Sequence, residues 1–278
     1  MPSLLSDLTS AAREAWESRE LLWQLTRRDV TIRYKQSVMG VAWALLLPGL
    51  IVLSGILIRL AMGTVSGHAV QLSELGGVAS KSVPWAFFTG AIGFGTGSLL
   101  SNSTLITRIY FPREVLPASA VLAQAFDSGI GALALMVALP QLGATLSPAL
   151  LWVPLLVLLL IAFTLAATLF LSCANLFFRD VKYLVQVLLT FGIFLTPVFF
   201  EPALFGPRIG RLIMLNPLSA ILEGFRLSII EGRSLAVAHP AELWQPAWLL
   251  YSALWSLLGL LLAIRYFRRS AAKFAEYA

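Results

Sequence analysis

The sequence predicts an all-α integral membrane protein with six transmembrane helices and both termini in the cytoplasm. Hydrophobic residues make up 58% of the 278 positions and charged residues 12%, whereas a soluble domain carries about 25% charged residues. The mean hydropathy is +0.83, so apolar surface has to face lipid. Several runs reach the roughly 20 apolar residues that a hydrocarbon core of ~30 Å requires.

Six such runs predict the spans, and the Pro and Gly residues inside them are tolerated in membrane helices. The predicted spans are Val41–Met62, Val83–Ser103, Pro117–Leu139, Leu150–Leu176, Tyr183–Phe200 and Trp244–Ile264. They make one membrane domain over 41–264, preceded by a cytoplasmic segment over 1–40 and followed by a cytoplasmic tail over 265–278.

The distribution of Lys and Arg predicts the orientation. With the N-terminus inside, 14 of the 20 basic residues fall in the N-terminal segment, the inner loops and the tail. The others, including Lys81 and Arg233, fall in outer segments, apart from Arg59 near the outer end of the first span. Cytoplasmic loops carry the excess of basic residues, so both termini are expected inside. The first 30 residues lack an apolar signal-peptide core, so the first span is expected to act as the targeting signal.

The segment before Gly40 predicts an amphipathic helix lying along the inner membrane surface. Its polar residues lie opposite a wide apolar stripe, a pattern typical of interfacial helices. A soluble helix is the alternative, and it leaves two tryptophans without a partner. The stripe consists of Leu4, Leu5, Leu8, Ala12, Ala15, Trp16, Leu22 and Trp23, and the opposite face of Glu14, Glu17, Glu20, Gln24, Arg27 and Arg28.

The outer segment over 201–243 predicts two short re-entrant helices. Its apolar run Leu212–Ile230 is broken by Asn216-Pro217, and Glu223 and Arg226 interrupt its second half. A seventh span would also place the basic tail outside. Irregular backbone at membrane depth occurs where protein or water covers it, so these helices are expected at the mouth of a pathway. An ordinary helix pair outside the membrane is the alternative.

The sequence carries no catalytic constellation. The histidines His68 and His239 lie in separate outer loops without neighbouring ligands, so a metal site is not expected. No lysine follows a glycine, which excludes a phosphate-binding P-loop. If the protein moves a substrate with ATP, a separate chain supplies the ATPase. The basic isoelectric point is explained by inner loops, so no nucleic-acid partner is expected.

Asp127 is the one acidic residue inside a predicted span. A carboxylate at membrane depth is a functional hypothesis by default. A polar contact within the bundle is favoured over a proton relay or a pore-lining role, because no basic residue lies at matching depth.

Aromatic residues gather on the second and fifth spans, with Trp85, Phe87, Phe88 and Phe94 on one and Phe191 and Phe194 on the other. Those near span ends, such as Trp85 and Trp244, fit interfacial belts. Those deeper could pack in the core, face lipid, or line a channel in which flat rings stack on sugars.

Several motifs together resemble the permease subunit of type 2 ABC exporters, in the branch that exports lipid-linked polysaccharides such as O-antigen and teichoic acid. The resemblance covers nearly the whole chain. It rests on Leu25–Val30, Arg33–Ser37 and Gly40-x-x-Trp43 before the first span, Tyr110–Glu114 in an inner loop, Asn216–Leu218 with Glu223–Arg226, and Phe267–Arg269 in the tail.

This resemblance implies a homodimer in the bacterial inner membrane, bound to two copies of a cytoplasmic ATPase that hold ATP and magnesium, so no cofactor is expected in this chain. The substrate would be a polysaccharide on undecaprenyl pyrophosphate, moved through a channel beside the first, second and fifth spans. Contact with the ATPase is implied for Trp16, Trp23, Arg27, Arg28, Arg108, Tyr110, Phe111, Pro112, Arg113 and Glu114. Arg33, Tyr34 and Lys35 would lie at the substrate entrance, where the basic cluster meets either the pyrophosphate or the anionic leaflet. Asn216, Pro217, Glu223 and Arg226 would form the outer gate.

Three other functions stay open at this point. A type 2 exporter of small lipids or drugs shares the six-span plan but not the polysaccharide-type motifs. A proton-coupled carrier would be favoured by inverted repeats, and none is visible. A membrane enzyme would need clustered acids or histidines.

Overall fold

The computed structural model describes residues 13, 14, 16–35, 37–67, 69–108, 111–271 and 274–277. Regular structure in these ranges is helical, apart from an isolated antiparallel bridge between His239 and Trp244. The α-helices are α2 (Arg19–Tyr34), α3 (Ala42–Ser66), α4 (Leu72–Thr96), α5 (Ser98–Ser101), α6 (Ser103–Arg108), α7 (Val115–Ala138), α8 (Trp152–Phe177), α9 (Val181–Leu195), α10 (Gly206–Met214), α11 (Pro217–Ile229), α12 (Pro246–Ala271) and α13 (Phe274–Tyr277). Short 3-10 turns cover Leu139–Leu142, Pro148–Leu151, Pro202–Phe205 and Pro240–Glu242.

Four helical stretches of the described chain are long and apolar enough to cross a membrane. They contain α3, α7, α8 and α12 and correspond to the predicted first, third, fourth and sixth spans. The shortest has 24 residues, or ~36 Å at 1.5 Å per residue, against a hydrocarbon core of ~30 Å.

Helix α4 corresponds to the second predicted span, but the predicted boundaries were wrong. The helix begins at Leu72 rather than Val83, and it ends at Thr96 rather than running on to Ser103. It therefore contains Glu74 and Lys81. The prediction that Lys81 lies in an outer loop is wrong, because its side chain is 1% exposed inside the bundle.

Helix α9 corresponds to the fifth predicted span and is shorter than predicted. Its 15 residues extend ~22 Å, less than the thickness of the hydrocarbon core. It ends at Leu195 because Thr196 has extended backbone and Pro197 follows, a combination that does not continue a helix. The six-span count depends on α4 and α9 and stays a prediction.

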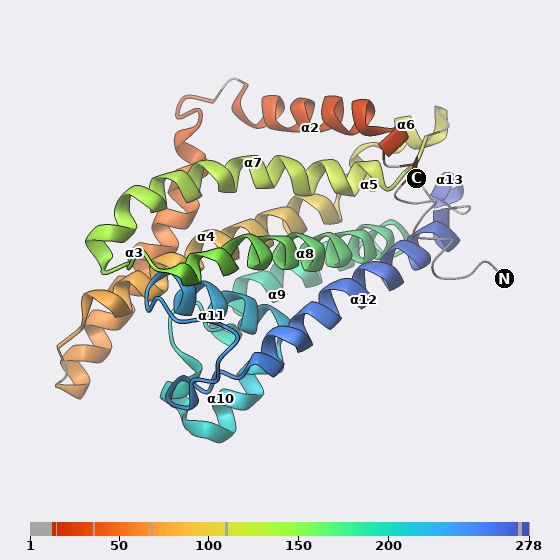
Figure 1. Ribbon diagram of the computed structural model, residues 1–278. Helices are drawn as coiled ribbons and strands as arrows, with labels where there is room; N and C mark the ends of the chain where they lie inside the picture. The colour runs from red at the N-terminus through yellow and green to blue at the C-terminus, as the bar shows by residue number, and fades with distance from the viewer. Residues whose placement is uncertain are drawn as a thin grey trace.

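Helix α4 lies inside the bundle and contacts α3, α7, α8 and α11 (Figure 1). Its glycines allow these close approaches. A Cβ on Gly95 would overlap the Thr168 side chain of α8, and a Cβ on Gly90 would lie 2.5 Å from the Gln124 side chain of α7. Small residues let membrane helices pack backbone to backbone.

Helix α2 packs along α7. Asp29 accepts a hydrogen bond from Ser119 at 3.0 Å, and Arg33 donates to Gln124 at 2.9 Å, so the two helices run in the same direction. Trp16 and Trp23 are 70% and 66% exposed, whereas Leu25 and Thr26 are buried. The contact with α7 is thus centred on Leu25, Thr26, Asp29 and Arg33. Four residues of the predicted polar face, Glu17, Glu20, Gln24 and Arg27, are exposed like the two tryptophans. The helical wheel did not predict this division. The rest of the predicted stripe, at Leu4, Leu5, Leu8, Ala12 and Ala15, lies outside the described residues.

The segment after α9 forms two short helices, α10 and α11, separated at Asn216. The Asn216 side chain caps α11 by accepting the backbone N–H of Leu218 at 3.1 Å, and Pro217 occupies the first helical position, where no N–H is needed. Helix α11 is buried along most of its length against α4, α8 and α12. In Figure 1, α10 and α11 lie toward one end of the bundle, and α6 and α13 lie at the other.

The two tryptophans predicted to lie in interfacial belts are core residues instead. Trp85 is 4% exposed and Trp244 is fully buried. The Trp244 indole N–H donates to the Leu235 carbonyl at 3.2 Å, which satisfies its polar atom inside the protein. α12 begins only at Pro246, after this buried anchor.

Candidate functional site

A cleft of about 380 Å³ runs between α3, α4 and α9. Its α4 wall carries Trp85, Thr89, Gly93 and Thr96, which lie three or four residues apart and therefore share one helix face. The α9 wall carries Lys182, Val185, Gln186, Leu189, Thr190 and Ile193, and α3 adds Leu47 and Ile51. Apolar walls thus hold a line of hydroxyl, amide and ammonium groups.

The threonines of this cleft are already partly satisfied by their own helices. Thr89 donates to the Trp85 carbonyl at 3.0 Å, and Thr190 donates to the Gln186 carbonyl at 2.8 Å. Their oxygen lone pairs can still accept hydrogen bonds. Such a surface offers weak, repeated contacts to a hydroxylated ligand.

The aromatic residues predicted to line a channel are distributed over different surfaces. Trp85 lies on the cleft wall. Phe87 faces a separate apolar cavity shared with α7 and α8, and Phe88 stacks on Phe163 of α8 with ring centroids 6.0 Å apart. Phe191 and Phe194 lie on an exposed face of α9, at 61% and 60% exposure.

A second cavity, of about 540 Å³, joins α2, α3, α4 and α7, and the predicted entrance residues Arg33 and Tyr34 both line it. Asp127 accepts hydrogen bonds from both, with the Tyr34 oxygen at 2.6 Å. The Arg33 guanidinium also lies over the Phe94 ring, 3.9 Å from its centroid, a favourable cation–π geometry. Lys35 is exposed just beyond the end of α2.

The partners of Asp127 establish a polar contact within the bundle. Asp127 and Arg33 are largely buried, with 11% and 16% of their side chains exposed. Burial and the hydrogen bond to Asp127 raise the pKa of the Tyr34 hydroxyl far above its usual value, so the hydroxyl stays a neutral donor. The basic partner of Asp127 is Arg33, which comes from α2 and not from a predicted span. Comparing the depths of residues within the spans therefore could not reveal it.

The inner loop is held to the C-terminal helix by its predicted docking residues. Glu114 accepts a hydrogen bond from Arg268 at 3.1 Å, and Arg268 also contacts Glu14 at 2.8 Å. Arg113 donates to the Ala271 carbonyl. Phe111 packs against the apolar cluster at this end of the bundle, and Pro112 is half-buried beside it. Tyr110 and the side chain of Arg108 lie outside the described part of the chain.

Arg28, on α2, is also held by neighbours, whereas Arg27 is exposed. Arg28 donates to Asp29 and Asn102 at 2.9 Å each. The predicted contact face for an ATPase therefore contains both internally paired and exposed cations.

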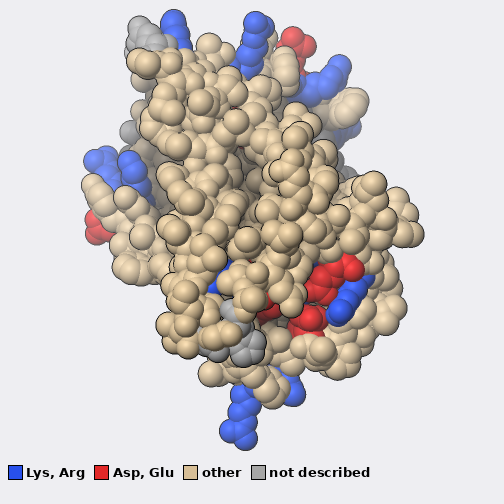
Figure 2. Space-filling model, turned by 90° about the vertical axis from the view of Figure 1, so that its left-hand side faces the viewer, with Lys and Arg blue, Asp and Glu red and all other residues tan. Residues whose placement is uncertain are grey.

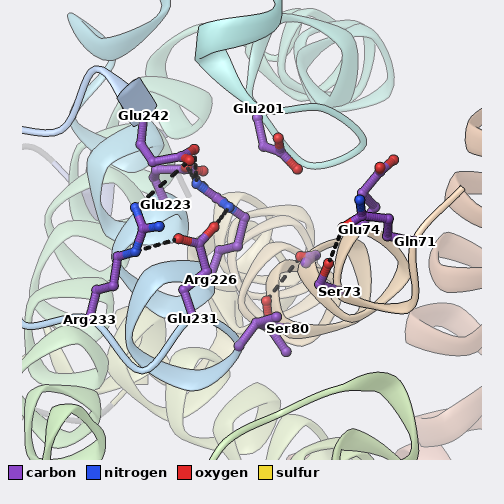
Figure 3. Close-up of polar contacts among 12 residues, drawn as sticks. Gln71, Ser73, Glu74, Ser80, Glu201, Glu223, Arg226, Glu231, Arg233 and Glu242 are labelled. Atoms are coloured by element: carbon purple, nitrogen blue, oxygen red, sulfur yellow. Dashed lines mark hydrogen bonds and ion pairs between the residues drawn. The ribbon is translucent and has the colours of Figure 1, made fainter. Parts of the chain in front are cut away.

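Two of the predicted outer-gate residues, Glu223 and Arg226, belong to a larger buried charge network (Figure 3). Arg226 contacts Glu223, Glu231 and Glu242, with 2.7 Å to both Glu223 and Glu242. Lys81 of α4 lies 3.8 Å from Glu223 and donates to the Phe200 carbonyl at 2.8 Å. Asn216 donates to the Thr196 hydroxyl at 3.3 Å, linking the helix cap to the end of α9.

A neighbouring ion-pair group extends this network toward α3. Arg59 contacts Glu201 at 3.0 Å and Glu74 at 3.3 Å, and its side chain is 6% exposed. Figure 2 shows that charged side chains are sparse over the middle of the face it displays and lie mostly toward its edges, with acidic and basic side chains next to one another at the lower right. The roles of Glu74, Lys81 and Glu201 were not predicted. The available signal was the i, i+3 pair Glu223 and Arg226, which predicts charges satisfied locally but not their distant partners.

Comparison with known proteins supplies a family for this arrangement. Residues 20–230 match the family described as ABC-2 type transporter. The chain is also 28% identical to the O-antigen export system permease protein RfbA of Myxococcus xanthus, over 80% of this chain and 84% of the relative. It is 26% identical to the permease of the same name from Klebsiella pneumoniae, over 77% of this chain and 81% of that one.

Proposed function

Because the chain belongs to the ABC-2 type transporter family, we propose that it is the transmembrane subunit of an ATP-driven exporter of lipid-linked polysaccharide. It is a multi-pass protein of the bacterial inner membrane. Members of this family are membrane subunits of transporters and work with an ATP-binding partner subunit. The resemblance to O-antigen permeases over about four-fifths of each chain is the observation that carries the proposal.

In the proposed arrangement, α4 and α9 cross the membrane with the four longer apolar helices, and α10 and α11 re-enter from the outer side. Both termini face the cytoplasm, as the excess of basic residues in the inner segments favours. Helix α9 can cross despite its length, because the chain continues through Thr196 to Phe200 under cover of α3 and α4, where Arg59 and Lys81 bind its carbonyls. Such covered irregular backbone is allowed at membrane depth.

The proposed pathway is the cleft between α3, α4 and α9. Lys182, Gln186, Thr190 and Thr89 would be costly to expose to hydrocarbon. A second copy of the subunit placed over this face would enclose them and turn two half-clefts into one water-filled channel. The substrate is an undecaprenyl-pyrophosphate-linked polymer, whose hydroxyls match the polar line.

The ATPase would bind at the end of the bundle that carries α6, α13 and the inner loop. Two copies of the partner would meet Trp16, the exposed face of α2 with Trp23 and Arg27, and the loop around Phe111 and Pro112. The ion pairs of Glu114 and Arg268 connect that loop to α12, so a displacement of the loop would be transmitted to the bundle.

The test blocks the cleft without disturbing the subunit. Gly93→Leu adds a side chain on the cleft wall, where a Cβ meets no atom within 4 Å in the single subunit. In cells lacking the native gene, this variant is expected to accumulate normally and to reduce surface polysaccharide more than tenfold. Gly129→Leu on α7 is the matched control, since its Cβ is equally unobstructed and lies away from the cleft. Normal surface polysaccharide in the Gly93→Leu strain would overturn the proposed pathway.

Cells that lack the gene altogether test the alternative substrate class. If their surface polysaccharide is normal but their efflux of drugs or lipids is altered, a small-molecule exporter would be favoured.

A further inference from the structure

A groove of about 550 Å³ lies between α8 and α12, away from the cleft. Its volume falls within the range of about 300–1,000 Å³ that is typical of ligand sites. None of its lining residues comes from α3, α4 or α9, so it shares no element with the proposed pathway.

Small side chains make this groove deep enough for an aliphatic chain. Ala166 and Ala167 of α8 face Gly259 and Ala263 of α12, and a Cβ on Gly259 would lie 3.8 Å from the Ala166 Cβ. Half-exposed rings border it, at Phe170 and Trp255. Between these rings the floor and walls are apolar.

The groove is strongly asymmetric in charge. Arg265 and Arg269 line one end of it, and no acidic residue is among its described lining residues. The two arginines are four positions apart on α12, so they share one face, where like charges repel. Arg268 points elsewhere, toward Glu114 and Glu14. The C-terminal end of α12 favours cations by itself, and guanidinium groups on one helix face can donate together to one anion.

The length of the groove matches one leaflet of a bilayer. Trp255 and Arg265 are ten residues apart on α12, or ~15 Å at 1.5 Å per residue, which is half of the ~30 Å hydrocarbon core. Tyr266, whose ring contacts Phe170 with centroids 5.3 Å apart, lies beside the arginines, where aromatic residues with a polar tip meet headgroups.

We propose that this groove binds one anionic membrane phospholipid, with its headgroup phosphate at Arg265 and Arg269 and an acyl chain along α8 and α12 toward Trp255. Guanidinium groups bind phosphate oxygens in a bidentate manner, and basic pockets between membrane helices bind anionic headgroups. The phosphate-bearing export substrate is not the occupant, because the groove is separate from the cleft. The choice of the inner leaflet rests on the proposed orientation, whereas binding itself does not.

The experiment uses the full chain, delipidated in a non-ionic detergent and titrated with palmitoyl-oleoyl phosphatidylglycerol or with the phosphatidylcholine of the same acyl chains. Bound lipid is counted by native mass spectrometry, and the unfolding temperature is followed in parallel. Phosphatidylglycerol is expected to bind roughly tenfold or more tightly than phosphatidylcholine. The double variant Arg265→Gln/Arg269→Gln is expected to lose that preference. Arg208→Gln/Arg211→Gln, which removes two exposed charges from α10, is expected to keep it.

A second variant tests lipid binding in the groove if the double variant fails to fold. Ala167→Leu fills the groove without changing its charge and is expected to weaken binding of both lipids. Equal affinity of the native chain for the two lipids would overturn the proposal, as would unchanged phosphatidylglycerol binding in Ala167→Leu. Neither measurement involves polysaccharide, so a failure of the proposed export function would leave this result unaffected.

Discussion

Arg226 illustrates, at the scale of single residues, how a charge is held inside an otherwise apolar chain. Its side chain is 5% exposed and is surrounded by carboxylates from α11 and from the loop that follows it. Removing an ion from water costs several kcal/mol unless its partners are well placed. The sequence indicates Glu223 as a partner through its i, i+3 spacing. Glu231 and Glu242 could not be predicted, because a loop conformation brings them to the same site.

Replacing Arg226 by Ala is expected to destabilise the fold by about 3–5 kcal/mol, because three carboxylates would lose their common cation. Arg233→Ala is the matched control, since Arg233 contacts two of the same carboxylates but is 42% exposed. Its loss is expected to cost within about 1 kcal/mol. Unfolding in mixed micelles with increasing SDS, followed by tryptophan fluorescence, gives both values. Similar losses for the two variants would show that the network does not depend on Arg226.

Asp127 and Arg33 are expected to stabilise the fold as a pair. Both side chains are mostly buried and joined by a hydrogen bond, and hydrogen bonds to charged groups contribute about 1.5–3 kcal/mol. A double-mutant cycle with Asp127→Asn and Arg33→Gln is expected to give a coupling energy in that range, measured in the same unfolding assay. Tyr34→Phe serves as a neutral comparison, with an expected loss of about 1 kcal/mol.

The same variants separate the structural role of Asp127 from its alternatives. If each variant accumulates normally, surface polysaccharide should fall only in proportion to lost stability. Additive effects in the cycle, together with export lost in a fully stable Asp127→Asn protein, would instead indicate a pore or proton role.

At the scale of elements, the long apolar helices were predictable and the helices with buried charge were not. α3, α7, α8 and α12 follow from uninterrupted apolar runs. The start of α4 was missed because Glu74 and Lys81 read as an outer loop until their partners on α3 and α11 are known. The contact face of α2 was missed for the same reason, since Asp29 and Arg33 bind to side chains of α7 rather than to water. Periodicity reports where apolar residues are, not whether a charge has a distant partner.

Contact between α4 and α8 gives a test at this scale. Gly95→Ala is expected to destabilise the fold by about 1–3 kcal/mol, because the new methyl group overlaps the Thr168 side chain. Adding Thr168→Ala should recover most of the loss, since its Cβ would then lie 3.4 Å from the new one. Gly93→Ala, on an open face of the same helix, is expected to leave stability unchanged or raise it by up to about 1 kcal/mol. The comparison is of SDS unfolding midpoints, and a double variant as unstable as Gly95→Ala would refute this account of the contact.

For the whole molecule, the surface of one subunit leaves several apolar helix faces uncovered. On α9, Leu184, Leu188, Phe191 and Leu195 are each more than 60% exposed and recur at spacings of four, three and four. On α12, Leu250 and Leu254 are exposed to a similar degree. Exposure alone therefore does not distinguish a face that meets lipid from one that meets another subunit. The polar cleft distinguishes the two faces, because it borders α9 and not α12. From the sequence, membrane class and family resemblance could be predicted, whereas this distinction depends on which helices are neighbours in space.

The dimer face can be tested by disulfide crosslinking, because Cys173 is the single cysteine and is buried. In a Cys173→Ser background, single cysteines replace Leu184, Leu188, Phe191 and Leu195 in turn. In a two-fold dimer, residues near the axis meet their own copies. At least one of these α9 positions is therefore expected to form covalent dimers on mild oxidation of membranes, seen on non-reducing gels. The control is Leu254 on α12, which is 62% exposed. The Leu254→Cys variant is expected to remain monomeric, because this position would face lipid. Crosslinking through α12 but at none of the α9 positions would place the dimer axis elsewhere, and the cleft between α3, α4 and α9 could then not be half of a shared channel.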